Sequence, residues 1–169
     1  MEQLPLAFDI GPPRWSFSRL VVRSAHFERL RERIEIVRVF FPELNGVTVR
    51  VGLALKRGVL GWGSLDPERP GIWVRPRRLE LFTIAHEMTH LLQARGLVPR
   101  GERACDLWAL ARSALVIDSA PGYLKMPRGL RDGRLDAADA AMLHRFAVEA
   151  IAARDQGDRR YLQRFERAV

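Results

Sequence analysis

The sequence contains very little cysteine and no long hydrophobic run. Cys105 is the only cysteine in 169 residues, so no disulfide can form within the chain. No stretch approaches the roughly 18 uninterrupted apolar residues of a membrane-spanning helix, because charged residues interrupt each run. The first residues, MEQLPLAFDI, lack the basic start and long apolar stretch of a signal peptide. These absences argue against membrane insertion and predict a cytoplasmic protein.

Lysine is also scarce, although the chain is strongly basic. Only Lys56 and Lys125 are lysines among 28 basic residues, which face 20 acidic residues and give a net charge of +8. Such a balance favours acidic partners such as nucleic acid. The arginines are spread over most of the chain, however, as in a surface rich in ion pairs or under biased codon usage. The charge therefore gives nucleic acid only weak support as a partner.

Length and hydrophobic content predict one compact domain. The chain is 47% hydrophobic, which is enough for a real core. Residues 1–24 form an expected irregular lead-in, because prolines concentrate near its start, and no internal repeat follows. We therefore expect a single domain over residues 25–169.

The periodicity changes from strand-like to helical about halfway along the chain. Apolar residues recur every three or four positions over residues 25–41, which predicts an amphipathic helix. Strands are expected over residues 47–53, 59–62 and 72–74. Helices are then expected over residues 78–95, 102–117, 135–153 and 159–169, with a loop over 119–134. This order predicts an α+β fold with a small mixed or antiparallel sheet.

One segment carries a recognisable chemical pattern. Residues 86–90, HEMTH, match HExxH and lie inside the helix predicted over residues 78–95. Two histidines four positions apart lie about 40° apart around a helix, so both His86 and His90 can reach one Zn²⁺. Glu87 stands beside them. The spacing thus supplies two metal ligands and a general base.

The apolar residues of the motif helix fall on the side opposite the histidines. They are Leu81, Ile84, Met88, Leu91 and Leu92. We therefore expect this helix to bury its back and to point its ligands into a cleft. The alternatives are a surface helix with solvated polar residues, or a histidine pair that satisfies buried hydrogen bonds.

A catalytic zinc also needs a third protein ligand and an open position for water. The longer pattern HExxHxxGxxH fails, because Gln93 and Gly96 stand where it requires glycine and histidine. The remaining histidines, His26 and His144, have no suitable spacing. A third histidine ligand is therefore not expected.

The next predicted helix opens with two acidic residues one turn apart. Glu102 and Asp106 share a face, and residues 97–101 can span up to about 16 Å, enough to return Glu102 to the metal. The alternatives are that Glu102 is only an acid stabilised at a helix N-terminus, and that Asp106 is solvated or paired in a salt bridge.

HEMTH followed by E-x-x-x-D on the next helix resembles the gluzincin class of zinc metallopeptidases. In that class a glutamate on a second helix completes a two-histidine site. The interval of eleven residues between His90 and Glu102 is similar to that of the most compact members, the minigluzincins. The resemblance covers residues 25–117 and implies a zincin-like fold, in which a helix and a small sheet precede the motif helix and the ligand helix.

The resemblance also implies a set of roles. His86, His90 and Glu102 would hold Zn²⁺, Glu87 would be the general base, and Asp106 would orient a ligand histidine. The implied activity is hydrolysis of peptide bonds by a metal-activated water, with a peptide or protein as the partner.

An extended substrate peptide would add a strand to the sheet edge near Trp62 or Trp73. Cys105, on the ligand helix, is a further residue that could face the metal, although a small buried thiol is the more common arrangement.

Two other functions stay open. A SprT-like protease acting on DNA-bound proteins resembles this chain in size and in HExxH, and the net charge of +8 would suit such a role, but those proteins use a third histidine. A non-catalytic zincin-like binding or regulatory module would suit a chain with little left for the far wall of a cleft. Residues 118–134, which include Tyr123, or the helix bearing His144 would have to form that wall. Tyr123 and His144 are possible oxyanion donors, but residues in such contexts more often pack.

Overall fold

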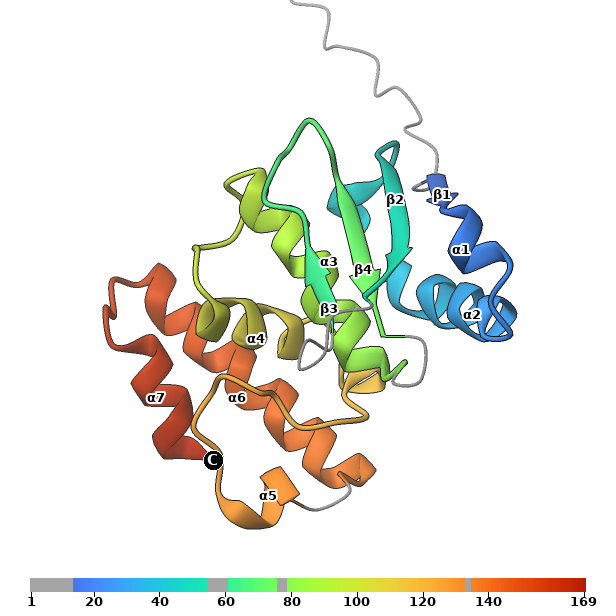
Figure 1. Cartoon of the computed structure of the whole chain (residues 1–169). Coiled ribbons are helices and arrows are strands. Elements are labelled where there is room, and N and C mark those ends of the chain that lie inside the picture. Colours follow the sequence, from blue (N-terminus) through green and yellow to red (C-terminus); the bar gives the residue numbers. More distant parts are fainter. Residues whose placement is uncertain (1–13, 55–60, 76–78, 133–134) are drawn as a thin grey trace, which may run out of the picture.

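The sheet is small and mixed, and it lies on one side of the molecule (Figure 1). The computed structural model describes residues 14–54, 61–75, 79–132 and 135–169. In those ranges the sheet has the strand order β1-β2-β4-β3. Strand β2 is parallel to β1 and β4, whereas β3 is antiparallel to β4. The strands are β1 (Arg14–Phe17), β2 (Thr48–Leu53), β3 (Gly61–Gly63) and β4 (Gly71–Val74). The predicted α+β class is confirmed, and of the two predicted kinds of small sheet, mixed or antiparallel, the structure has the mixed one.

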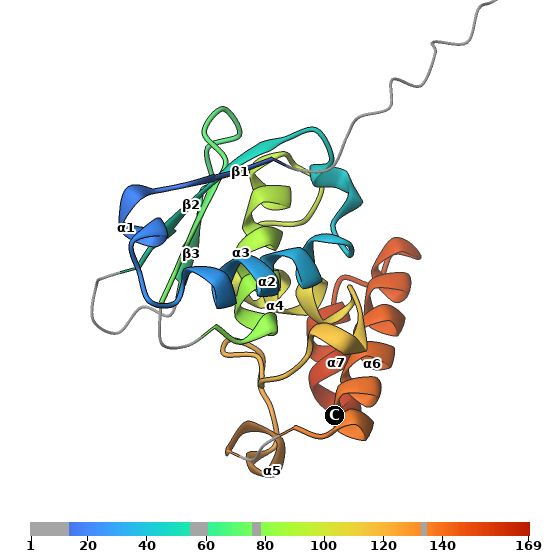
Figure 2. The same cartoon turned by 90° about the vertical axis from the view of Figure 1, so that its right-hand side faces the viewer.

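The helices form successive layers behind the sheet. Figure 2 shows the sheet on one side and α6 and α7 on the other, with α3 and α4 between them. The described α-helices are α1 (Arg19–Val22), α2 (Phe27–Arg38), α3 (Leu81–Ala94), α4 (Glu102–Leu110), α5 (Arg128–Asp132), α6 (Ala137–Asp155) and α7 (Tyr161–Ala168). Two 3₁₀-helices are η1 (Pro42–Leu44) and η2 (Ala114–Val116). Among these, none combines the length and apolarity needed to cross a membrane.

Helix α3 is the centre of the core. All but one of its residues from Phe82 to Gln93 are buried, because the helix packs against both the sheet and the helices behind it. A residue more than 30 positions later in the sequence caps the first turn of α3. The Asp118 carboxylate accepts hydrogen bonds from the main-chain N–H groups of Leu81 and Phe82, at 2.8 and 3.0 Å, and pairs with Arg33 at 3.2 Å. This contact fixes where α3 begins.

Strand β1 corrects the prediction that residues 1–24 are irregular. Residues 1–13 lie outside the described part of the chain, but residues 14–17 form a strand and residues 19–22 a short helix. The strand was not predicted because only Trp15 and Phe17 alternate with polar residues, too few to reveal a period of two. Helices α1 and α2 then cross over to join β1 to the parallel β2.

Most other predicted elements are present with shifted ends. The helix predicted for residues 102–117 stops at Leu110, because Ser113 has an extended backbone and its hydroxyl caps the separate η2 turn. The predicted loop over 119–134 contains the short helix α5. Of the strand expected at 59–62, residues 61 and 62 belong to β3, and residues 59 and 60 lie outside the described ranges. The helices expected over 25–41, 78–95, 135–153 and 159–169 correspond to α2, α3, α6 and α7.

Two glycines let β3 lie directly on the HExxH segment. A Cβ built on Gly63 would stand 2.5 Å from the main-chain oxygen of Glu87 and 2.6 Å from Cβ of His90. A Cβ on Gly61 would stand 2.6 Å from Oε1 of Glu87. All three separations are well inside van der Waals contact, so side chains at these positions would force the strand away from α3.

Replacing Gly63 by alanine should lower the free energy of unfolding by about 1–3 kcal/mol, because the added methyl group meets main chain that cannot rotate away. Gly129→Ala in α5 is the matched control, since a Cβ there meets nothing within 4 Å and alanine favours a helix. Urea denaturation of both variants measures the difference. Equal stability of Gly63→Ala and the parent protein would contradict the close approach of β3 to α3.

Candidate metal centre

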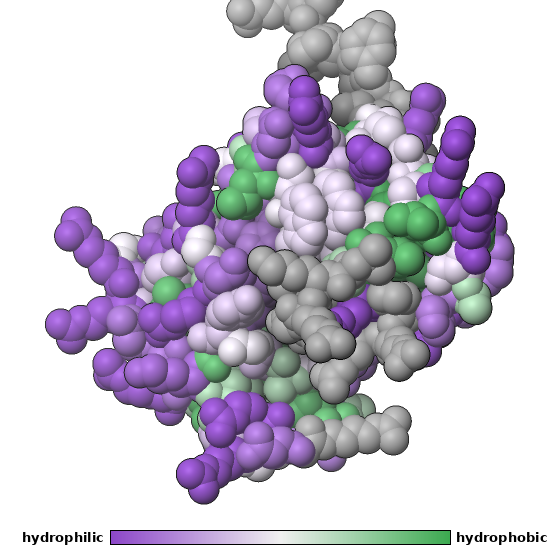
Figure 3. Space-filling view, viewed as in Figure 1, coloured by the Kyte–Doolittle hydropathy of each residue, from purple (hydrophilic) through white to green (hydrophobic). Residues whose placement is uncertain are grey.

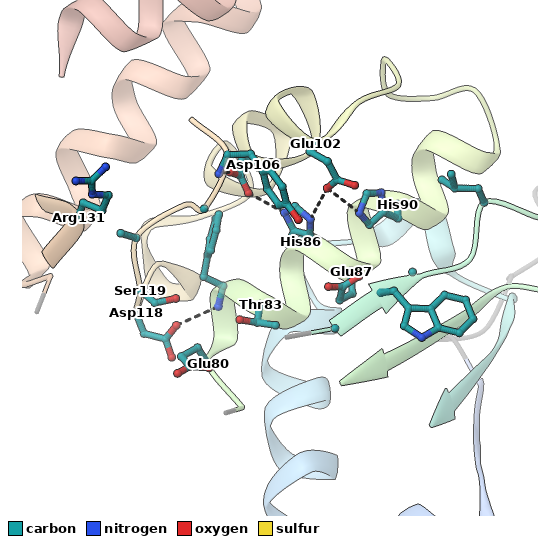
Figure 4. A pocket seen from close by; sticks show the side chains of 18 residues that line it. Glu80, Thr83, His86, Glu87, His90, Glu102, Asp106, Asp118, Ser119 and Arg131 are labelled. Carbon is teal, nitrogen blue, oxygen red and sulfur yellow. Dashed lines mark hydrogen bonds and ion pairs between the residues drawn. The ribbon is translucent and has the colours of Figure 1, made fainter. Parts of the chain in front are cut away.

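The residues singled out from the sequence line one cavity of about 760 Å³ (Figure 4). His86, Glu87 and His90 come from α3, whereas Glu102 and Asp106 come from α4. The buried back of α3 lies in the core, and the polar side chains face the cavity. The structure therefore brings all five residues together, although they belong to two helices.

One carboxylate oxygen of Glu102 faces both histidines. Its Oε2 lies 3.2 Å from Nε2 of His86 and 3.4 Å from Nε2 of His90. Two atoms bound at about 2.0–2.1 Å to a tetrahedral Zn²⁺ stand about 3.3–3.4 Å apart. Both separations are close to that edge length, so Oε2 of Glu102 stands from each Nε2 at the spacing of two donors on one tetrahedral ion.

Each histidine is held through its other ring nitrogen. Nδ1 of His86 lies 2.7 Å from Oδ1 of Asp106, and Nδ1 of His90 lies 2.7 Å from Oε1 of Gln93. Because both partners accept hydrogen bonds at these atoms, each Nδ1 carries a proton, and in the neutral ring the lone pair is therefore on Nε2, which faces Glu102. This tautomer is the one that metal binding through Nε2 requires.

Asp106 fixes a loop as well as His86. Its side chain is 1% exposed, which excludes the alternative of an ordinary solvated residue. Besides the bond from His86, its Oδ2 accepts main-chain N–H bonds from Tyr123 at 2.7 Å and Leu124 at 3.3 Å. The carboxylate therefore links the motif helix to the loop that borders the cavity.

Gln93 is a site residue that the sequence analysis missed. Besides holding His90, its Nε2 donates to the main-chain oxygens of Pro99 at 2.6 Å and Gly101 at 3.0 Å. Gly101 has a φ of 106°, in the region that favours glycine, and it turns the chain into α4 at Glu102. The signal that could have identified Gln93 is its position three residues after His90, on the same side of the helix.

Glu87 is buried beside β3 and keeps unused hydrogen-bonding capacity. The residue is 4% exposed, and within the described part of the chain its Oε2 has no hydrogen-bond partner. Burial raises the pKa of Glu87 to about 8, although the nearby charge of His86 opposes the shift. A buried carboxyl group with an unpartnered oxygen can exchange a proton with a water or substrate group in the cavity.

The two histidines differ in their preference for charge. Burial disfavours the charged form of both rings. At His86 the hydrogen bond and negative charge of Asp106 outweigh burial and raise the pKa above its usual value. At His90 burial is the larger effect, and the hydrogen bond to the neutral Gln93 does not outweigh it, so the pKa of His90 is lowered. Asp106 is therefore the stronger of the two ring partners.

Cys105 is the alternative third donor. His86, His90 and Cys105 each offer one ligand atom, and these three atoms lie within 4.8 Å of one another. The thiol, however, donates a hydrogen bond to the main-chain oxygen of His86 at 3.1 Å, and burial raises the pKa of Cys105, which keeps the thiol protonated. Glu102 is the stronger candidate, because its oxygen already faces both Nε2 atoms.

The two other histidines lie away from the cavity, whereas Tyr123 borders it. His26 stands at the start of α2, and Nδ1 of His144 bonds the main-chain oxygen of Leu110 at 2.9 Å. The ring of Tyr123 stacks on His86 with 5.7 Å between ring centroids, and burial raises the pKa of its hydroxyl. The described residues therefore offer no third histidine at this site.

Comparison with known proteins adds no family assignment. No protein-family model matches the chain, and no curated protein or solved structure matches it significantly. The function of the site must therefore be argued from its own geometry.

Asp106→Ala should lower the free energy of unfolding by about 2–4 kcal/mol, because it leaves His86 and two main-chain N–H groups without their buried acceptor. Glu149→Ala on the exposed side of α6 removes a carboxylate whose nearest charged partner is 3.9 Å away, so it should change stability by no more than about 0.5 kcal/mol. Thermal or urea denaturation measures both. A loss no larger for Asp106→Ala than for Glu149→Ala would refute this structural role.

Proposed function

We propose that this chain is a zinc-dependent metallopeptidase in which His86, His90 and Glu102 hold Zn²⁺. The observation that carries the proposal is the position of Glu102 Oε2, 3.2 and 3.4 Å from the two Nε2 atoms, while each Nδ1 is held by an acceptor. A zincin-like fold and kinship with the compact gluzincins belong to the same proposal. They are supported by HExxH on a central helix and by a glutamate at the start of the next.

The bound ion would supply Lewis acidity, lowering the pKa of a bound water toward 7 and polarising a substrate carbonyl. The remaining work belongs to the protein. Asp106 and Gln93 keep the two imidazoles in the required tautomer and orientation. Glu87 accepts one proton of the attacking water at its unpartnered Oε2 and passes that proton to the leaving amine nitrogen. The C–N bond breaks, and a carboxyl group and an amine leave.

The free edge of β3 is where we place the substrate backbone. Among the described strands β3 pairs only with β4, so its outer edge can accept one more strand. Gly61 and Gly63 keep that edge close to Glu87. Trp62, Leu65 and Tyr123 also line the cavity and are about half exposed, which offers apolar side chains a place to pack. An extended peptide, or an unfolded protein segment, fits this arrangement.

The identity of the third ligand can be tested by metal binding. Glu102→Ala should weaken zinc binding by more than about 100-fold, beyond the loss typical of an outer hydrogen-bond partner. Cys105→Ala should keep one zinc per chain with little change in affinity. Competition with a chromophoric chelator gives both affinities, and elemental analysis gives the stoichiometry. If Cys105→Ala loses the ion while Glu102→Ala keeps it, the assigned donor set is wrong.

Glu87→Gln should retain zinc but lower the rate of peptide hydrolysis by about 10²–10⁴-fold, since an amide cannot accept the proton of water. Glu149→Gln on α6 is the surface control and should cleave at the parental rate. Cleavage of a peptide library and of an unfolded protein, followed by mass spectrometry, measures both. A zinc-loaded parent protein that cleaves neither substrate would instead indicate the non-catalytic zincin-like module.

A further inference from the structure

The outer face of the sheet carries two stacked indole rings. Trp62 on β3 and Trp73 on β4 are direct partners in the ladder. Their rings are 3.8 Å apart between centroids and inclined by 3°. Because Trp73 covers one face of Trp62, and Trp62 is still 48% exposed, the opposite face of that ring meets solvent. The pair therefore presents a flat aromatic surface outside the core.

Two glycines on the strands beneath Trp73 leave room for its ring. A Cβ on Gly52 would stand 2.3 Å from Cδ1 and Nε1 of Trp73, and one on Gly71 would stand 2.7 Å from Cη2 of the same ring. Because these glycines, on the neighbouring strands β2 and β4, have no side chains, the ring of Trp73 can lie close against the sheet. Trp73 in turn holds Trp62 parallel to it. The exposed ring is thus supported from below and is not a loosely placed surface residue.

The described strands of this face carry charge of one sign. The four described strands contain Arg14 and Arg50 but no aspartate or glutamate. Both arginines are exposed and alternate with residues that point toward the core. Within the described ranges, neither guanidinium group has a hydrogen-bond or ion-pair partner. The acidic residues of the β3–β4 loop, Asp66 and Glu68, lie outside the strands.

Arg50 stands beside the indole pair. It is the register partner of Gly71, whose missing side chain makes room for Trp73. Figure 3 shows this side of the molecule, where long hydrophilic side chains surround a paler, less polar area over the strands. An open aromatic ring and guanidinium groups without a partner among the described residues therefore occur together on one surface of a chain with a net charge of +8.

We propose that this surface, defined by Trp62, Trp73, Arg14 and Arg50, binds single-stranded nucleic acid. An unpaired base stacks on the open face of Trp62, which any base can do because each has a π-face. The phosphates of neighbouring nucleotides pair with Arg14 and Arg50. In a duplex the bases are stacked on one another, so their faces are not free to stack on Trp62. An acidic peptide contains no bases, so it cannot stack on Trp62 in this way. The inference rests neither on the metal nor on peptide hydrolysis, although Trp62 also borders the cavity.

Fluorescence anisotropy with labelled dodecamers of thymidine and of uridine tests the proposal on the full chain. A duplex of equal length and a polyglutamate peptide are the comparison ligands. One or both single strands should bind and quench indole fluorescence, and the duplex and polyglutamate should bind at least about tenfold more weakly. The two single strands show whether DNA or RNA is preferred. Absence of binding to both strands at low salt would overturn the proposal.

Trp62→Ala should weaken single-strand binding by about 5- to 150-fold, the range found when an aromatic ring that stacks on a base is removed. Trp62→Leu, which keeps apolar bulk without an aromatic ring, should lose as much, whereas Trp62→Phe should retain most of the affinity. Arg50→Ala should reduce the slope of log affinity against log salt by about 0.7, the value for one lost phosphate contact on a single strand.

Arg159→Ala is the matched control. Arg159 is also exposed but lies at the turn between α6 and α7, away from the sheet. Its removal should change neither the affinity nor the salt slope by as much as Arg50→Ala. Parental affinity in both Trp62→Ala and Trp62→Leu, or polyglutamate binding as tight as that of the oligonucleotides, would refute base stacking.

Discussion

Two buried hydrogen bonds, one donated by Nδ1 of each histidine, determine the geometry of the site. Without them either ring could rotate or change tautomer, and the two Nε2 atoms would no longer point to one place. Their acceptors, Asp106 and Gln93, also bind main-chain groups of the loops on each side of α4. The orientation of the imidazoles, the loop that delivers Glu102 and the loop that carries Tyr123 therefore depend on the same two side chains.

The central position of α3 makes this precision possible. The helix is enclosed by the sheet, by α2 and by α4, and Asp118 caps its first turn, so it can neither slide nor rotate without disturbing several layers. Strand β3 is held against the HExxH segment because Gly61 and Gly63 have no side chains. A central helix thus holds His86, Glu87 and His90, and an edge strand borders them.

Local sequence predicted the parts of the site that depend on helical phase. The spacing of His86, Glu87 and His90 is enough to place three polar groups opposite an apolar back, and the short interval to Glu102 brings a carboxylate within reach. The features that the local sequence did not predict depend on contacts between segments that are distant in the sequence. Gln93 gains its role from the loop at Gly101, β1 from pairing with β2, and the indole pair from glycines on two different strands.

The close approach of β3 to α3 has a consequence for recognising related proteins. Steric contacts and hydrogen bonds connect three sequence segments at the site. They are the two glycines of β3, the HExxHxxQ segment of α3 and the E-x-x-x-D segment of α4. A change at one of these positions must be matched at another, so they should covary in divergent homologues. This composite pattern is more selective than HExxH alone, and it can be searched for where overall sequence similarity has vanished.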